Sequence, residues 1–288
     1  MKKIVRFTWT RKLTHNEPRF REEAQKIGDI DINFICYFDV YYHNWFRYLS
    51  TKEPVKDYDI IWIGWIRGRS LRDGIVYYYC HLYSKKLVDK LKYHMLSYDK
   101  FTQILFLEYY WFNTPESLFF VFTNEYKEKY INILEQTLNY PFIAKDVEKD
   151  QWKWIHLIKE RKQLEELIDN NEEIGFLFQE YIENKWDYRT LVVWEKVIWT
   201  IKRYNENDFK NNFSTGALAQ SENLPDNINK IAVDIANKFN LHIAWVDFFI
   251  ENWKYYVIEI NDLPQYQAFE EATGISYPYE VLNYFKNL

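Results

Sequence analysis

Oxygen-bearing side chains recur near the end of the chain, within two runs of otherwise apolar residues. Asp247 lies in the run WVDFFIE, and Glu259 and Asn261 lie in the run VIEIND. Side chains two residues apart on a strand share a face, so Glu259 and Asn261 point the same way. Buried polar groups are costly unless they are satisfied, and two carboxylates with an amide oxygen suit Mg²⁺ held together with phosphates. The residues alone leave two interpretations open: a magnesium site, or a hairpin whose acidic residues face water.

Three basic residues precede this segment. Lys145 follows the apolar run YPFIA, and Arg189 and Arg203 lie within predicted strands. An unpaired guanidinium on an apolar strand is costly, which favours a functional partner for both arginines. The six histidines and two cysteines follow no metal-ligand spacing, so we assign them no role.

The order of these motifs resembles the ATP-grasp superfamily, most closely its ribosomal-protein glutamate ligases and related carboxylate–amine ligases. The resemblance covers roughly residues 96–270 and is most specific in the run 178–264, which contains FQEYIE, DYR, TIKR and FKNNFSTGA. It implies an ATP-dependent, ADP-forming ligase that makes C–N bonds through an acyl-phosphate intermediate. The implied cofactors are ATP and Mg²⁺, with Mn²⁺ as an alternative metal. The implied partners are a carboxylate substrate and an amine, which is an amino acid, a peptide or a protein tail.

The resemblance also implies individual roles. The early lysines would contact phosphate, the segment 180–182 would meet adenine, and Asp187 would lie near the ribose; these ATP-binding residues are Lys100, Lys145, Glu180, Tyr181, Ile182 and Asp187. Two arginines would face the transferred phosphoryl group and an asparagine the reacting centre; these catalytic residues are Arg189, Arg203 and Asn212. The implied metal ligands are Asp247, Glu259 and Asn261. Simpler interpretations stay open: Lys100 as a helix-surface lysine, Asp187 as a turn residue and Asn212 as a loop cap.

The elements that must position these residues follow from hydrophobic periodicity. Strands at 3–8, 32–38 and 59–66 alternate with helices at 19–27 and 76–91, which predicts a parallel sheet. Farther along, two antiparallel hairpins (188–193 with 196–203, and 243–250 with 255–260) flank an amphipathic helix at 226–239. These patterns predict an α/β and α+β protein, and the resemblance implies its arrangement: a small Rossmann-like N-terminal domain followed by a two-subdomain ATP-grasp fold. The predicted domains are 1–95 and 96–288, the latter divided into a lid-bearing part (about 96–182) and a metal-binding, catalytic part (183–288).

Composition limits the class of protein. A net charge of −5 argues against binding to nucleic acid or to an anionic membrane. Two isolated cysteines and the lack of a signal peptide or a long apolar run predict a soluble, cytoplasmic protein. The oligomeric state is left open. The alternative function is a catalytically impaired nucleotide-binding pseudoenzyme that acts as an interaction module.

Tryptophan outnumbers glycine 12 to 7, although glycine makes up about 7% of ordinary sequences. Eight tryptophans stand where the ATP-grasp pattern has or accepts glycine: Trp111, Trp152, Trp154, Trp186, Trp194, Trp199, Trp245 and Trp253. Indoles at 152 and 154 would fill the space where lid amides meet phosphate, and position 253 lies in a turn that favours positive φ. Position 245 lies on a strand beside the metal site, where a close approach of the backbone favours glycine, which has no side chain. A gene that reads UGA as glycine, translated with UGA as tryptophan, would explain all eight. The alternative is a divergent, aromatic-rich ligase.

Overall fold

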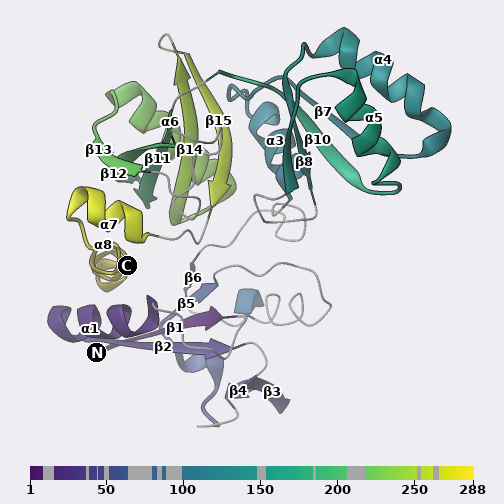
Figure 1. Ribbon diagram of the computed structural model, residues 1–288. Coiled ribbons are helices and arrows are strands. Elements are labelled where there is room, and N and C mark those ends of the chain that lie inside the picture. The colour runs from purple at the N-terminus through teal and green to yellow at the C-terminus, as the bar shows by residue number, and fades with distance from the viewer. Residues whose placement is uncertain are drawn as a thin grey trace.

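The computed structural model describes residues 1–8, 16–36, 39–43, 45–48, 52–63, 80–82, 86–88, 99–147, 154–183, 186–205, 218–251, 254–261 and 266–288. Within these ranges the chain forms an N-terminal, a central and a C-terminal sheet, with helices packed against them (Figure 1). None of the helices in these ranges combines the length and the apolar character that a bilayer span requires.

The N-terminal sheet is wholly parallel and has the strand order β2-β1-β5-β6. Its strands are β1 (Lys2–Thr8), β2 (Ile30–Cys36), β5 (Ile60–Ile63) and β6 (Leu87–Val88). Helix α1 (Asn16–Ile27) connects the first two strands and ends at Gly28, whose φ of 69° lies in the left-handed region that glycine adopts freely. The predicted parallel sheet is therefore present, whereas the Rossmann-like character of this region stays a prediction.

Two features of this N-terminal region differ from the sequence prediction. The helix predicted over 76–91 is wrong at 87–88, where β6 pairs with Ile61 and Trp62 of β5. Pairing with a neighbouring strand overrides the local helical pattern there. A small hairpin of β3 (Val40–His43) and β4 (Trp45–Tyr48) and a 3₁₀ turn, η2 (Val55–Asp57), were not predicted.

The central sheet is antiparallel and has the strand order β7-β10-β8-β9. Its strands are β7 (Ser117–Val121), β8 (Phe142–Asp146), β9 (Ile155–Ile158) and β10 (Gly175–Glu180). Helices α4 (Lys127–Thr137) and α5 (Arg161–Asp169) pack on its outer side, next to the turn η3 (Asn124–Tyr126), and α3 (Lys100–Tyr109) lies on the side of the C-terminal sheet (Figure 1).

The C-terminal sheet is antiparallel and has the order β13-β12-β11-β14-β15. Its strands are β11 (Trp186–Val193), β12 (Lys196–Tyr204), β13 (Leu218–Glu222), β14 (Ile243–Glu251) and β15 (Lys254–Asn261). Both predicted hairpins and the predicted helix, α6 (Asp226–Phe239), are present. The buried face of α6 packs with α3 on one side of the sheet, because its apolar residues recur at helical spacing.

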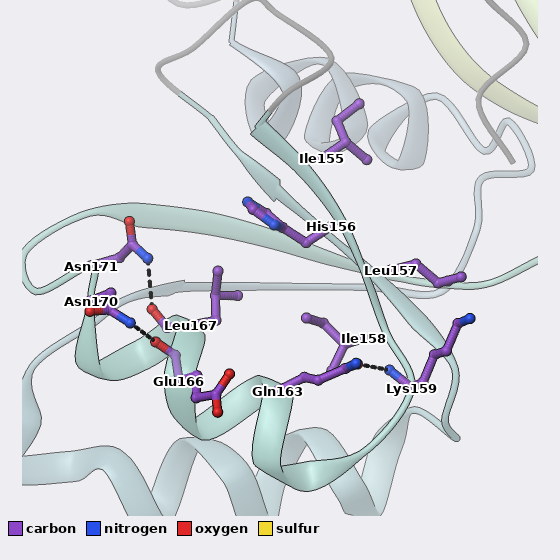
Figure 2. A pocket seen from close by; sticks show the side chains of 10 residues that line it. All are labelled: Ile155, His156, Leu157, Ile158, Lys159, Gln163, Glu166, Leu167, Asn170 and Asn171. Carbon is purple, nitrogen blue, oxygen red and sulfur yellow. Dashed lines mark hydrogen bonds between the residues drawn. The ribbon is translucent and has the colours of Figure 1, made fainter. Parts of the chain in front are cut away.

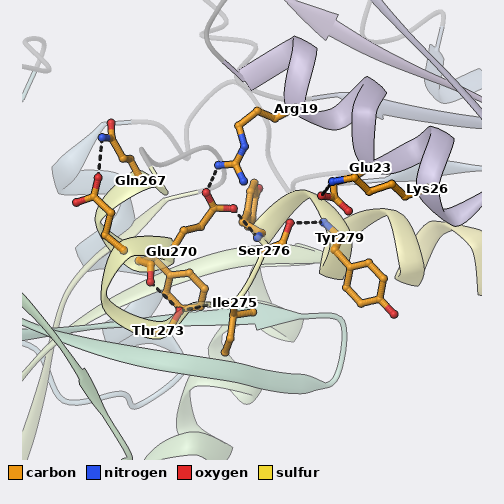
Figure 3. Close-up of polar contacts among 12 residues, drawn as sticks. Arg19, Glu23, Lys26, Gln267, Glu270, Thr273, Ile275, Ser276 and Tyr279 are labelled. Atoms are coloured by element: carbon orange, nitrogen blue, oxygen red, sulfur yellow. Dashed lines mark hydrogen bonds and ion pairs between the residues drawn. The ribbon is translucent and has the colours of Figure 1, made fainter.

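Helices α7 (Gln267–Thr273) and α8 (Tyr277–Asn287) lie between the C-terminal sheet and the N-terminal α/β layer. The rings of Trp62 in β5 and Phe285 in α8 meet edge-to-face at 5.3 Å, within a core that the two sheets share. Figure 3 shows the polar contacts at this junction, where Arg19 of α1 forms an ion pair with Glu270 of α7. The N-terminal layer therefore packs on the C-terminal part of the chain through α7 and α8. The division at residues 95/96 stays a prediction.

Candidate active site

Four charged side chains meet on one face of the C-terminal sheet. Asp187 and Arg189 lie two residues apart on β11, opposite Arg203 of β12 and Asp247 of β14, respectively. Arg189 donates from Nε and Nη2 to the two carboxylate oxygens of Asp247, at 2.8 and 2.6 Å. Arg203 donates from Nε to Asp187 Oδ1 at 2.6 Å and from Nη2 to Asp247 Oδ2 at 3.0 Å. These four residues, here called the charged cluster, form a chain of alternating charge.

The charged cluster lies at one end of an otherwise apolar face. Leu191, Ile201 and Trp245 continue the same three strands on that face and belong to the core shared with the N-terminal layer. The strand alternation that buries these residues also buries the charges, so each charge needs a partner. Two carboxylates and two guanidiniums balance one another, which explains how the sheet tolerates them.

Burial shapes the ionisation of both aspartates. Burial raises the pKa of Asp187 to about 6, although Arg203 opposes the rise. Burial acts on Asp247 in the same direction, but Arg189 and Arg203 together hold the pKa of Asp247 below its usual range. Asp187 is thus a direct partner of Arg203, and its implied contact with a ribose stays a prediction.

Two of the predicted metal ligands lie beside the charged cluster, on β15. Glu259 stands directly opposite Asp247, and Asn261 follows two residues later. A β-bulge next to Asp247 shifts the alternation of β15 by one residue, so that Val257 and Ile260 both pack into the core with α6. Glu259 and Asn261 face the other way, on the side of the charged cluster, and both are half-buried.

The donor set fits magnesium in chemical type, because all three side chains offer hard oxygens. Asp247 Oδ1 accepts one hydrogen bond and Oδ2 accepts two, which leaves Oδ1 with a lone pair in reserve. Among the described residues no three His, Cys, Asp or Glu side chains gather as a ligand set. The predicted set therefore depends on the amide oxygen of Asn261 as its third ligand.

The two predicted phosphate-binding lysines belong to the central sheet and to α3. Lys145 lies on β8, and its Nζ donates to Gln179 Oε1 of β10 at 2.5 Å. Gln179 Nε2 donates in turn to Ser117 Oγ of β7 at 3.0 Å. Lys100, the first residue of α3, donates from Nζ to the carbonyl oxygen of Asp146 at 3.4 Å. The end of β8 therefore brings both ammonium groups into one region.

The electrostatics of Lys145 connect the central sheet with β15. Burial lowers the pKa of Lys145 to about 8, while Glu259 acts to raise it and Lys100 to lower it. Lys145 and Glu259 lie within electrostatic reach of each other although they are on different sheets. The structure thus brings together a lysine and a metal-ligand candidate that are far apart in the sequence.

The predicted adenine-binding segment follows the end of β10. Glu180 donates its backbone N–H to the carbonyl of Glu116 at 3.0 Å, and its Oε1 accepts from the backbone N–H of Glu116 at 3.1 Å. Glu180, Tyr181 and Ile182 are half-buried and lie where the chain leaves the central sheet for the C-terminal one. Their contact with adenine stays a prediction. Asn212, Trp152 and Trp253 lie outside the described residues.

Two buried glutamines belong to this region and were not predicted. Gln179, which is 2% exposed, holds Lys145, and Gln103, which is 8% exposed, bonds the backbone of β15. A polar residue inside an apolar strand or helix is the signal that could have identified both.

A pocket of about 660 Å³ lies between β9 and α5, and Figure 2 shows the side chains that line it. Ile155, Leu157 and Lys159 line it from the strand side, and Gln163 and Asn170 from the helix. None of the predicted site residues lines this pocket. We therefore regard it as separate from the candidate active site.

The family model and the curated relatives that match this chain point to the same family. Residues 98–285 match the family model described as the RimK-like ATP-grasp domain. A probable alpha-L-glutamate ligase of Enterobacter sp. (strain 638) is 32% identical over 140 residues, covering 47% of this chain and 47% of that protein. The ribosomal protein bS6–L-glutamate ligase of Escherichia coli O7:K1 (strain IAI39 / ExPEC) is likewise 32% identical over 140 residues, with 47% of each chain covered. The chain spans about half the length of these curated relatives.

Solved structures extend the likeness to the whole chain. The ATP-grasp ligase PsnB, complexed with a phosphomimetic variant of its minimal precursor, Mg and ADP, gives a TM-score of 0.76 at 14% sequence identity. The match covers 100% of this chain and 98% of PsnB. Identity this low informs about fold alone, and the predicted ATP-grasp fold is confirmed.

Proposed function

Since this chain belongs to the RimK-like ATP-grasp family, we propose that it is an ATP-dependent, ADP-forming ligase that joins a carboxylate to an amine. The observation that carries the proposal is that Lys100 and Lys145 meet near the end of β8. Glu259, beside the charged cluster of the C-terminal sheet, acts electrostatically on Lys145. Cations from one sheet and hard oxygen ligands from another are what a triphosphate with its metal ion requires.

The proposed reaction has two steps, formation of an acyl-phosphate and then of the amide. A carboxylate oxygen of the substrate attacks the γ-phosphorus of ATP, the bond from that phosphorus to the β,γ-bridging oxygen breaks, and ADP leaves. The amine nitrogen then attacks the acyl carbon, and the bond from that carbon to the phosphate oxygen breaks. Phosphate leaves, and the nitrogen loses a proton to give the amide. Neither step needs a nucleophile from the protein.

The chain's own residues bind and orient the reactants. Lys100 and Lys145 would hold the phosphates, and Arg189 and Arg203 would face the transferred phosphoryl group from the C-terminal sheet. Mg²⁺, when bound, would neutralise phosphate charge, and Asp247, Glu259 and Asn261 are the side chains that would hold it. Mn²⁺ takes similar oxygen ligands and would replace it.

For the substrates we propose a peptide or protein tail and an amino acid. The Escherichia coli relative is named as a ligase of glutamate and ribosomal protein bS6, and PsnB was solved with a minimal precursor. These names support a polypeptide as one of the two partners.

A coupled ADP-release assay tests the proposed function. Glutamate and other amino acids are supplied with short peptides that carry free carboxylates, and ADP release is measured for each pair. We expect release that depends on both substrates. ATP binding without turnover for every pair would contradict the ligase and favour the pseudoenzyme.

We predict that Lys145→Ala raises KM for ATP and lowers kcat. A hydrogen bond to a charged group contributes about 1.5–3 kcal/mol, so kcat/KM should fall by about 10- to 100-fold. Lys100→Ala should act in the same direction. Lys159→Ala, which removes an exposed lysine just after β9, is the matched control and should leave ATP kinetics unchanged. Unaltered nucleotide binding in both Lys100→Ala and Lys145→Ala would refute the placement of the phosphates.

We also predict that kcat/KM for ATP falls as the pH rises through about 8, the lowered pKa of Lys145. Below this pKa the free enzyme carries the ammonium charge that attracts phosphate, and above it that charge is lost. Lys145→Arg stays protonated throughout the alkaline range, so its profile should lose this descending limb. A limb that persists unchanged in Lys145→Arg would assign it to another group.

A further inference from the structure

The side chain of Gln103 bonds the backbone of β15 at one residue. Gln103 Nε2 donates to the carbonyl oxygen of Ile260 at 3.1 Å, and the backbone N–H of Ile260 donates to Gln103 Oε1 at 3.1 Å. Both groups are buried, and 157 residues separate the two positions in the sequence. Within the described residues β15 is the last strand of its sheet, and Gln103 makes there the pair of bonds that a neighbouring strand would make.

The two peptide groups held in this way lead directly to the proposed metal ligands. The N–H of Ile260 belongs to the peptide unit that joins it to Glu259, and the carbonyl of Ile260 belongs to the unit that joins it to Asn261. Fixing both units restrains the backbone on which the Glu259 and Asn261 side chains stand. β15 ends at Asn261, so the clamp acts at the last residues of the strand.

A second contact shows that the region after α3 also covers this edge. The backbone N–H of Val257 donates to the carbonyl of Asn113 at 2.8 Å. That bond lies before the bulge, whereas the Gln103 bonds lie after it, next to the ligand candidates. The contact that can control the ligands is therefore the side chain of Gln103 rather than the main chain of the loop.

We infer that Gln103 is a positioning residue for the metal site, holding Glu259 and Asn261 in register for a divalent cation bound with nucleotide. This inference rests on the proposed function, because it concerns the same site. Lys100 lies one turn before Gln103 on α3, whose start is capped by Asp99 Oδ1 accepting from the backbone N–H of Thr102 at 2.8 Å. Helix α3 thus couples a phosphate-binding lysine to the metal-binding end of β15.

The test measures metal binding rather than turnover. Mn²⁺ is titrated into the full-length chain with the ATP analogue AMPPNP, and bound Mn²⁺ is followed by electron paramagnetic resonance. Gln103→Met keeps the volume and removes both hydrogen bonds. Loss of support to a metal ligand commonly weakens metal affinity by about 10- to 100-fold, and we expect a loss in this range. Binding of AMPPNP without metal should be unchanged.

Ile104→Ala is the matched control, since it removes packing from the next residue of α3 in the same core and leaves the Gln103 bonds in place. Its Mn²⁺ affinity should equal that of the parent. Parent-like affinity in Gln103→Met, or an equal loss in Ile104→Ala, would overturn the inference.

If Gln103→Met does not fold, a second variant tests whether Gln103 positions the metal ligands. Gln103→Leu also removes both hydrogen bonds and has a compact apolar side chain that suits this core, so a loss in the same range is expected, and no loss overturns the inference. A parent protein that binds no Mn²⁺ with AMPPNP would instead refute the proposed function.

Discussion

Glu259→Gln is expected to abolish Mg²⁺-dependent ATP turnover while leaving the fold intact. The glutamate is half-buried on β15 and makes no hydrogen bond that holds the charged cluster together. An amide of the same shape therefore preserves the strand but removes the charge that would hold the cation. Removing one electrostatic contact to a transferring group costs on the order of 10²–10³-fold in kcat, and we expect at least this loss.

The control for Glu259→Gln is Glu251→Gln, the same substitution at an exposed position on the neighbouring strand β14. Its turnover should match that of the parent. Thermal unfolding of both variants should also match, which separates loss of the metal ligand from loss of the fold. Turnover at the parent rate in Glu259→Gln would refute the metal assignment.

Asp247→Asn should abolish turnover as well, but for two reasons rather than one. Asp247 accepts hydrogen bonds from both Arg189 and Arg203. The substitution leaves two buried guanidiniums with one carboxylate, and breaking a buried pair costs about 3–5 kcal/mol. We therefore expect a lower melting temperature for Asp247→Asn than for Glu259→Gln, and the latter is the cleaner test of the metal site.

The sequence predicted the strands that carry the site but not how the strands meet. Alternating and continuous apolar runs indicated β11, β12, β14 and β15, because core-facing residues recur with the period of a strand. Costly burial of Arg189 and Arg203 also predicted that both need a partner. Their partners, Asp247 and Asp187, lie 58 and 16 residues away, and only the pairing of the strands reveals them. Register is a tertiary property that spacing in one chain does not contain.

The parts that the sequence missed depend on distant contacts. The bulge beside Asp247 turns Glu259 and Asn261 to the side of the charged cluster, and no glycine or proline marks it. Strand β6 exists because β5 offers it an edge, so a helical pattern was misread there. Gln103 became informative only once its partner, Ile260, was known.

The backbone at Trp111 has the conformation of a glycine. α3 ends in a Schellman motif, in which the N–H of Phe112 bonds the carbonyl of Leu107 and the N–H of Trp111 bonds that of Glu108. Trp111 occupies the left-handed position of this motif, with φ of 63°, and its side chain is 92% exposed. Helices α1, α6 and α7 end with Gly28, Asn240 and Gly274 in the same conformation. These are the residues that tolerate it, and tryptophan is not one of them.

Trp194 repeats the pattern in the hairpin between β11 and β12. It is the first of the two residues that join Val193 to its partner Lys196, and its φ is 57°. Two-residue hairpin turns favour glycine where φ is positive. Trp199, by contrast, lies on β12 with no positive φ, and its indole Nε1 donates to Ser221 Oγ at 2.7 Å. The eight tryptophans that stand at glycine positions of the family pattern thus differ in backbone conformation and contacts.

At position 245, by contrast, the packing favours tryptophan over glycine. The Trp245 indole is fully buried and meets the ring of Phe269 edge-to-face at 5.0 Å, so the core is closed around it. Its Nε1 has no hydrogen-bond partner within the described part of the chain, a defect that costs about 1–3 kcal/mol. The structural case for glycine therefore rests on positions 111 and 194.

We predict that Trp111→Gly and Trp194→Gly each raise the melting temperature, whereas Trp199→Gly lowers it. Left-handed φ costs a residue with a side chain about 1–2 kcal/mol, and glycine removes that strain at the expense of a more flexible unfolded chain. A net gain near 1 kcal/mol corresponds to a rise of about 2–4 °C for a chain of this size. Trp199→Gly is the matched control, because it loses strand packing and a hydrogen bond without relieving strain. Equal destabilisation by all three substitutions would contradict the prediction.

The codons give the decisive measurement. If the gene comes from a lineage that reads UGA as glycine, UGA stands at codons 111 and 194, and also at 152, 154 and 253, where glycine was predicted from the sequence alone. Indoles at 152 and 154 would then block the phosphate-covering lid, so the protein with tryptophan should be inactive, and the version with glycine at 111, 152, 154, 194 and 253 should turn over ATP with its substrates. UGG at 111 and 194 would refute this origin. Two strained backbone positions would then be a property of the natural chain, and the divergent, aromatic-rich ligase would be the correct interpretation.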